Sequence, residues 1–188
     1  MYNSLTSFIL RTIIVSIILI SAFFAPGCNK DLTDISSTPW EFSLNRSGCR
    51  GLCPVYSFQI NNNGIMKYVG YRYVKIDSSV TLQINEKQVN KLEGLFNSFD
   101  YFSFDSSYTH RMVTDLSTAT TSLKYGNKYK KVIHYLGDLE APYRISYFEI
   151  AVEEILETKI LTGLEPTDNY PDFNFEWIKC YDNIIKNY

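Results

Sequence analysis

Two hairpin signals constrain the fold of this chain more than any other feature of its sequence. Residues 55–60 alternate between apolar and polar side chains, which is typical of a strand with one buried face. Asn63-Gly64 follows this run, and Asn-Gly is the strongest short hairpin signal because both residues tolerate positive φ. Residues 65–76 are therefore predicted to return antiparallel to the first strand.

A second hairpin is predicted in the other half of the chain. Residues 118–125 and 129–136 are runs rich in β-branched and aromatic residues, and Gly126-Asn127 separates them. Both segments are long enough for a strand, and the Gly-Asn step between them supplies the turn.

A helical pattern follows each hairpin. After a short strand over residues 80–84, Asn85 is predicted to cap a helix in which Gln88 is the third residue. Pro142 suits the first turn of a second helix, whose apolar stripe continues to about Gly163.

These elements predict an α+β fold. The expected architecture is an antiparallel sheet built from two strand-strand-helix units, with both helices on one face. Six residues of the two helices should be buried between the helices and the sheet: Leu92, Phe96, Phe99, Phe148, Val152 and Ile155. Glu149, Glu153 and Glu157 lie four residues apart, where like charges repel, so a solvated helix face is predicted for them.

The N-terminal segment indicates export. Residues 1–27 place one basic residue, Arg11, before an uncharged apolar run of 14 residues, which is the layout of a secretory signal peptide. That run is shorter than the roughly 18–20 residues that cross a bilayer, which disfavours a permanent transmembrane anchor. It ends at Gly27-Cys28, which resembles the lipobox of bacterial lipoproteins. We expect lipidation, with palmitate, at Cys28; the alternative is a buried cysteine after an uncleaved helix.

The remainder of the chain is divided into three parts. Residues 28–38 are polar and are expected to form a tether, and residues 39–162 the α+β domain. Residues 163–188 are expected to be a C-terminal extension whose short aromatic helix docks on the domain, with Cys180 as a buried thiol.

The most distinctive motif runs from Cys49 to Tyr56 and reads C-x-G-x-C-P-x-Y. With the strand and the Asn63-Gly64 turn that follow, it resembles a family of bacterial envelope proteins, many of them lipoproteins, that is defined by domain of unknown function 6438. The resemblance covers roughly residues 40–178 and includes Thr114-Asp115 and Trp177-Ile178. It implies an envelope location, and it supplies no established activity and no catalytic residues.

Cys49 and Cys53 admit two interpretations. Gly51 between them permits a turn that brings their Cα atoms within about 7 Å, as a structural disulfide requires. C-x-x-x-C-P also resembles the copper-binding segment of envelope copper chaperones, in which His110 or His134 would be the third ligand. We prefer the disulfide, because a strand and not a helix follows the cysteines, and we expect no metal and no cofactor.

The second hairpin is basic and aromatic, and it is a possible binding surface. Its members are Lys124, Tyr125, Lys128, Tyr129, Lys130 and Lys131. In an envelope protein these residues suit anionic head groups, glycans or an acidic protein surface. The alternative is an ordinary edge hairpin, on which lysines discourage pairing with other strands. The formal net charge of -2 gives no field that would recruit nucleic acid, so no nucleic-acid partner is expected.

The sequence contains no G-x-S-x-G, no H-E-x-x-H and no glycine-rich phosphate loop, and no catalytic residue is predicted. The function expected is that of a non-enzymatic binding or scaffolding lipoprotein of the cell envelope, at the outer membrane in preference to the inner. Its lipid anchor would contact the membrane, and an envelope protein or glycan would be its partner. The rival hypothesis is a thiol redox or copper protein that uses Cys49 and Cys53.

Overall fold

The structure, a computed structural model, describes residues 38–170. The predictions for the leader over 1–27, for Cys28, for the tether up to residue 37 and for the extension from residue 171 therefore lie outside the described residues, as does Cys180. Within 38–170, no helix has the length and apolar character needed to span a membrane.

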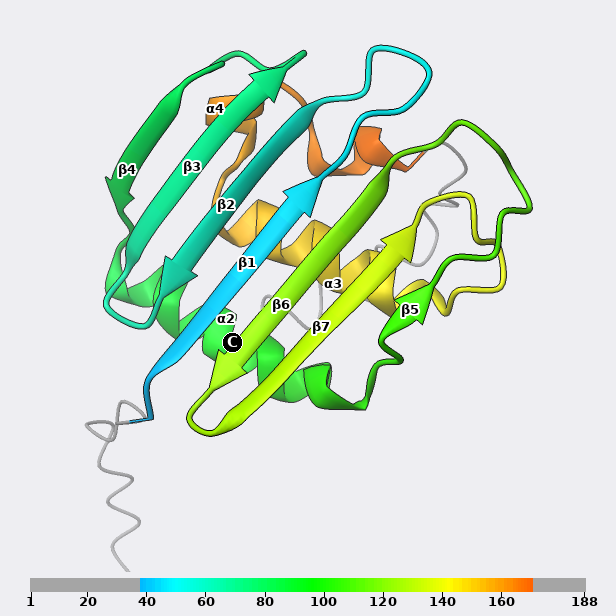
Figure 1. Cartoon of the computed structure of the whole chain (residues 1–188). Helices are drawn as coiled ribbons and strands as arrows, with labels where there is room; N and C mark the ends of the chain where they lie inside the picture. The colour runs from blue at the N-terminus through cyan, green and yellow to red at the C-terminus, as the bar shows by residue number, and fades with distance from the viewer. Residues whose placement is uncertain (1–37, 171–188) are drawn as a thin grey trace, which may run out of the picture. The chain divides into compact units, whose positions relative to one another are not determined.

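The described residues form a seven-stranded sheet in the order β4-β3-β2-β1-β6-β7-β5 (Figure 1). Neighbouring strands are antiparallel except for β5, which pairs in parallel with β7 over two residues. The strands are β1 Trp40–Arg46, β2 Val55–Asn61, β3 Ile65–Arg72, β4 Ser79–Gln83, β5 Ser107–Tyr108, β6 Thr118–Tyr125 and β7 Lys128–Tyr135.

The first predicted hairpin is confirmed, because β2 and β3 pair antiparallel. Gly64 adopts a φ of 75° in the turn. A Cβ at this position would lie 2.5 Å from the carbonyl oxygen of Ile84, so the turn needs glycine. The returning strand ends at Arg72 and not at residue 76, because the chain there leaves the sheet and hydrogen-bonds the backbone of α4 (Lys159–Thr162).

The second hairpin, β6 with β7, is also confirmed. Between the two hairpins lies β1, which was not among the predicted elements although Trp40–Arg46 alternates strictly between buried and more exposed positions. β1 pairs with β2 on one side and with β6 on the other. The sheet is therefore continuous, and the arrangement as two strand-strand-helix units is not confirmed.

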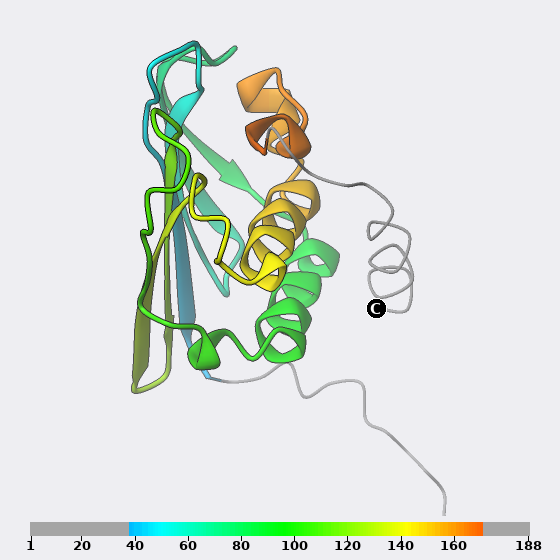
Figure 2. The same ribbon diagram turned by 90° about the vertical axis from the view of Figure 1, so that its right-hand side faces the viewer.

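Both long helices cover the same face of the sheet (Figure 2). α2 (Glu86–Ser98) begins at Asn85, whose side chain accepts a hydrogen bond from the backbone N–H of Gln88, as predicted. α3 (Tyr143–Ile155) begins directly after Pro142. The opposite face of the sheet has no helix over it among the described residues.

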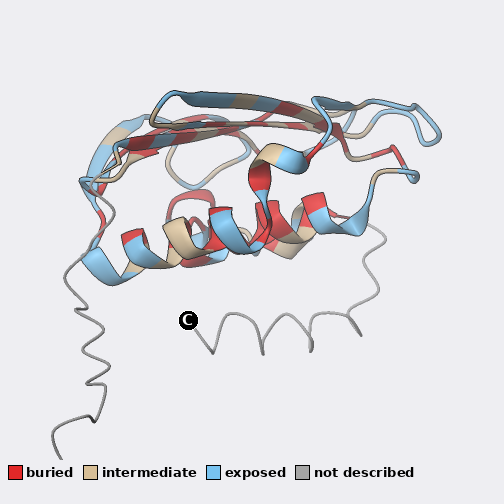
Figure 3. Ribbon diagram, turned by 90° about the horizontal axis from the view of Figure 1, so that it is seen from below, coloured by how far each residue is buried: buried red, intermediate tan, exposed pale blue. Residues whose placement is uncertain are grey.

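The core lies between these helices and the sheet, and all six residues predicted for it are buried. In Figure 3 the buried stretches of both helices face the sheet. Phe148 of α3 lies at the centre of an aromatic group, with its ring centroid 5.1 Å from that of Tyr101 and 5.8 Å from that of Phe42. Tyr101 belongs to η2 (Tyr101–Ser103), a short turn of helix after α2.

The second helix is shorter than its apolar pattern predicts. α3 ends at Ile155, and Glu157 then adopts a φ of 51°, which interrupts the helix before α4 begins. Because of this break, Ile160 leaves the apolar stripe and is exposed. Gly163, with a φ of 80°, ends α4, and η3 (Pro166–Asn169) follows.

Candidate functional site

The glutamates of α3 do not form the solvated face that their spacing predicts. Glu149 and Glu153 are both fully buried, and only Glu157, which lies beyond the helix, is exposed. The reason is a buried cation on a distant strand: Arg46, the last residue of β1, is also fully buried and faces them. A pattern of like charges along one helix carries no information about such a partner.

Arg46 binds both carboxylates. Its Nε and Nη2 donate to the two oxygens of Glu153, at 3.1 and 3.0 Å, and its Nη1 donates to Glu149 at 3.4 Å. Two parallel bonds to one carboxylate fix the guanidinium plane as well as its position. Burial without these partners would be very costly for an ionised side chain.

Two tyrosines and a histidine complete what we call the buried ion cluster: Arg46, Tyr56, His134, Glu149, Glu153 and Tyr170. Tyr56 donates its hydroxyl hydrogen bond to Glu153, and Tyr170 donates to Glu149 at 2.5 Å. The Nδ1 atom of His134 lies 3.1 and 3.2 Å from the two oxygens of Glu149. The cluster thus joins β1, β2, β7 and α3 to the residue after η3.

The pKa values of the two carboxyl groups are shifted in opposite directions. Burial alone would raise the pKa of Glu149, but His134, Arg46 and the hydrogen bond from Tyr170 outweigh it and leave that pKa below its usual value. For Glu153 burial dominates, so its pKa is raised despite the attraction of Arg46. Burial would lower the pKa of Arg46, yet Glu153 and its other neighbours hold it well above the ordinary value. Burial and charge pairing thus move the pKa values of the two carboxyl groups apart, with that of Glu149 lowered and that of Glu153 raised.

The C-x-G-x-C-P-x-Y motif builds one side of this cluster. Cys49 and Cys53 lie at disulfide distance, with sulfurs 1.92 Å and Cα atoms 5.6 Å apart, and close the loop between β1 and β2. On either side of that loop, Arg46 and Tyr56 are directly opposite each other in the strand register. Both side chains point to the same face and contact Glu153. The loop thus holds together the two strand ends that present the arginine and the tyrosine.

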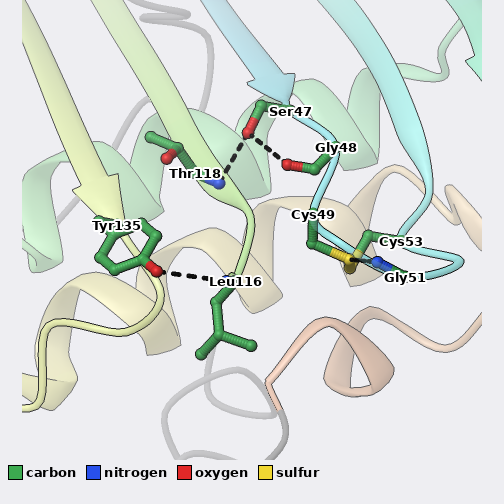
Figure 4. Close-up of a disulfide and its surroundings, with 8 residues drawn as sticks. All are labelled: Ser47, Gly48, Cys49, Gly51, Cys53, Leu116, Thr118 and Tyr135. Carbon is green, nitrogen blue, oxygen red and sulfur yellow. Dashed lines mark hydrogen bonds between the residues drawn. A yellow bond between two sulfur atoms is a disulfide. The ribbon is translucent and has the colours of Figure 1, made fainter. Parts of the chain in front are cut away.

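The start of the disulfide loop is attached to β6 (Figure 4). The hydroxyl of Ser47 accepts a hydrogen bond of 2.9 Å from the backbone N–H of Thr118 and donates one to the carbonyl of Gly48. The backbone N–H of Ser47 in turn donates to the carbonyl of Thr118. Nearby, Leu116 donates its backbone N–H to the hydroxyl of Tyr135 at the end of β7. The loop is therefore held in place from the neighbouring strand as well as by its own disulfide.

Two hollows adjoin at this end of the sheet. The first, of about 190 Å³, has His134 and Tyr170 of the buried ion cluster in its wall, together with Val113, Leu139 and Tyr143. The second, of about 320 Å³, lies beside the disulfide and is lined by Leu52, Pro54 and Leu164 among others. Leu116 and Leu136 line both hollows. Exposed apolar side chains stand at the rim, where Leu52 is 78% exposed and Leu139 58%. Polar residues line the hollows as well: Ser117, Asp138, Ser146, Asp168 and Asn169.

Residues 41–156 match the family described as domain of unknown function DUF6438. The chain belongs to this family. The matched range of the DUF6438 domain contains the whole Cys49–Tyr56 motif and every member of the buried ion cluster except Tyr170. No curated protein matches the chain.

The structure divides the basic hairpin of the DUF6438 domain between two faces. Strand alternation places Lys124, Tyr129 and Lys131 on the open face, opposite to buried Leu123 and Val132. Tyr125, Lys128 and Lys130 point to the helix side. There Tyr125 donates a hydrogen bond to Glu93 of α2, and Lys128 lies 5.6 Å from the centre of the Phe102 ring. The six residues do not form one surface.

The two histidines of the DUF6438 domain also occupy different environments. His134 is buried against Glu149, whereas His110 is exposed, with its Nδ1 atom 3.1 Å from Glu140. Within residues 38–170, no group of three or more His, Cys, Asp or Glu side chains is arranged as a metal-binding site.

Arg46, Glu149, Glu153 and Tyr170 were not among the predicted site residues. One signal was available for Arg46. It occupies an inward position at the end of the alternating run Trp40–Arg46, and an arginine at a buried position requires a carboxylate partner.

Proposed function

We propose that this protein is a lipoprotein of the cell envelope whose DUF6438 domain binds another envelope protein at the two hollows beside the disulfide. The observation that carries this proposal is the pair of adjoining hollows with exposed apolar side chains at their rim. Exposed apolar residues that gather around a concavity are typical of a protein contact site.

The disulfide and the buried ion cluster beside this surface support the proposal. The disulfide fixes the loop on one side, and the buried ion cluster lies behind the wall formed by His134 and Tyr170. A partner that docks here would meet a preformed surface and would lose little binding free energy to ordering it. This gives the buried cluster a supporting role in binding, with no reacting group of its own.

The envelope location is supported by the sequence before the domain. Arg11, the apolar run and Gly27-Cys28 are arranged as in a lipoprotein leader. A lipid on Cys28 would hold the domain within reach of a membrane through a polar tether of about ten residues. The tether would leave the hollows free to meet a membrane-bound partner.

We expect the mature protein to begin at an acylated Cys28. Intact mass spectrometry of the full-length protein expressed in a bacterium with an outer membrane measures this directly, and the Cys28→Ser variant is the control that should stay unprocessed and unacylated. A mature N-terminus at any other residue, or a wild-type mass without lipid, would refute the lipoprotein assignment.

We expect a partner protein to contact Leu52 and Leu139. A photo-reactive amino acid placed at either position in the full chain should give one discrete cross-linked product of the same partner in intact cells. The same group at Ile65, which is also exposed but lies at the opposite end of the strands, is the matched control and should not give it. Equal cross-linking from all three positions, or none from the two rim positions, would refute the docking site.

A thiol redox role is the second candidate, because Cys49 and Cys53 both line the second hollow. The cross-linking experiment separates the two functions. A docking site should still give the product at Leu139 when both cysteines are replaced by serine. A redox partner that reacts with the disulfide should be lost in that variant.

A further inference from the structure

We propose that the DUF6438 domain pairs with a second copy of itself through the outer edge of β4, which extends the sheet across a twofold axis. β4 is the outermost strand on its side of the sheet. This surface is separate from the hollows, and the inference does not depend on the proposed function.

The backbone of β4 offers hydrogen-bonding groups along this edge. Ile84 and Ser78 flank β4; Ile84 donates to the carbonyl of Gly64 and Ser78 accepts from Gly70, so both flanking residues bond inward to the β3 side. Inward and outward positions alternate along an antiparallel strand, and no register shift interrupts this pair. The outward groups therefore belong to the alternate residues Ser79, Thr81 and Gln83.

The two edges of the sheet differ in charge. Beside β7 the open edge carries Lys128, Lys130 and Lys131, and charged side chains discourage the pairing of strands from two molecules. β4 consists of Ser, Val, Thr, Leu and Gln and has no charged residue and no proline. The edge at β4 therefore lacks charged side chains and proline, two of the features that prevent strand addition.

A second copy fits this edge in one register. If Thr81 lies opposite Thr81 of the other copy, Ser79 lies opposite Gln83 and Val80 lies opposite Leu82. All outward backbone groups then belong to hydrogen-bonded pairs. On the helix side, Val80 of one copy would cover Leu82 of the other, which is 37% exposed in the single chain. Because the strand is uncharged, no like charges meet.

A pairing of two five-residue strands covers less than the roughly 800 Å² per partner of a standard interface, so the association should be weak. A covalent trap is therefore the suitable test. Across an antiparallel hydrogen-bonded pair the Cα atoms lie about 5.5 Å apart, which a disulfide spans. The full-length Thr81→Cys variant, in cells treated with the thiol oxidant diamide, should give a disulfide-linked dimer several-fold above the wild-type background from its own cysteines.

The register supplies matched controls. Ser79→Cys and Gln83→Cys should each stay at the wild-type level, because copies of the same residue would lie about 13 Å apart along the strands. The Ser79→Cys/Gln83→Cys double variant should cross-link as Thr81→Cys does. Thr81→Lys, which places two lysines face to face, should abolish cross-linking of that double variant.

Three results would overturn the inference: no dimer of Thr81→Cys above the background, equal dimer from the single Ser79→Cys variant, or a Thr81→Cys adduct to a different protein in place of the dimer.

Discussion

Replacing Arg46 by alanine is expected to lower the free energy of unfolding by about 3–5 kcal/mol, because it leaves two fully buried carboxyl groups without their cation. Denaturation of the purified full-length chain by urea measures the loss. Arg50→Ala is the matched control. Arg50 follows Arg46 by four residues, but it is 83% exposed and meets Asp115 at 3.5 Å, so its loss should cost no more than about 0.5 kcal/mol.

A rescue experiment separates charge from packing in this result. When Glu149 and Glu153 are both changed to glutamine in the Arg46→Ala chain, much of the lost stability should return, because no unpaired buried charge remains. If the rescued chain is no more stable than Arg46→Ala alone, or if the Arg46 and Arg50 variants lose equal stability, the buried ion cluster does not have the energetic role described here.

The Cys49→Ser/Cys53→Ser double variant is expected to lose about 2 kcal/mol of stability, the chain-entropy cost of opening a loop of this length. Thermal or urea denaturation measures the loss with and without dithiothreitol. Reduced wild type should match the double variant, and the double variant itself should not respond to the reductant. Its copper content should equal that of the wild type.

Two outcomes would contradict this prediction. A double variant as stable as the oxidised wild type would mean that the disulfide does not hold the loop. Stoichiometric copper on the wild type that disappears in the double variant would favour the copper hypothesis over the structural disulfide.

Local signals predicted the hairpins and the first helix well, because their determinants are neighbours in sequence. Asn63-Gly64 makes its own turn, and Asn85 caps α2 through the backbone of Gln88, three residues on. The predicted end of α3 was wrong because the apolar stripe continues past the break in the helix. A positive φ at Glu157 produces this break. A non-glycine residue with positive φ leaves no reliable trace in a periodic pattern.

The buried ion cluster was missed for the opposite reason. Each pair of partners is distant in sequence, and Arg46 and Glu153 are 107 residues apart. From the spacing of Glu149 and Glu153 along α3, only their mutual repulsion could be predicted. That repulsion is outweighed by a residue on another element, which no local window contains.

The long separation between Arg46 and Glu153 also bears on the order in which the domain folds. During synthesis β1 and β2 emerge well before α3. Until α3 emerges, the Arg46 guanidinium has no buried carboxylate to pair with, so its burial is unfavourable. We therefore expect β1 and β2 to remain solvated and mobile on the ribosome. Docking of α3 brings Glu149 and Glu153 to Arg46, so we expect the domain to fold late and in a single cooperative step. The rate of this step should be set by the closure of the long chain segment between β1 and α3.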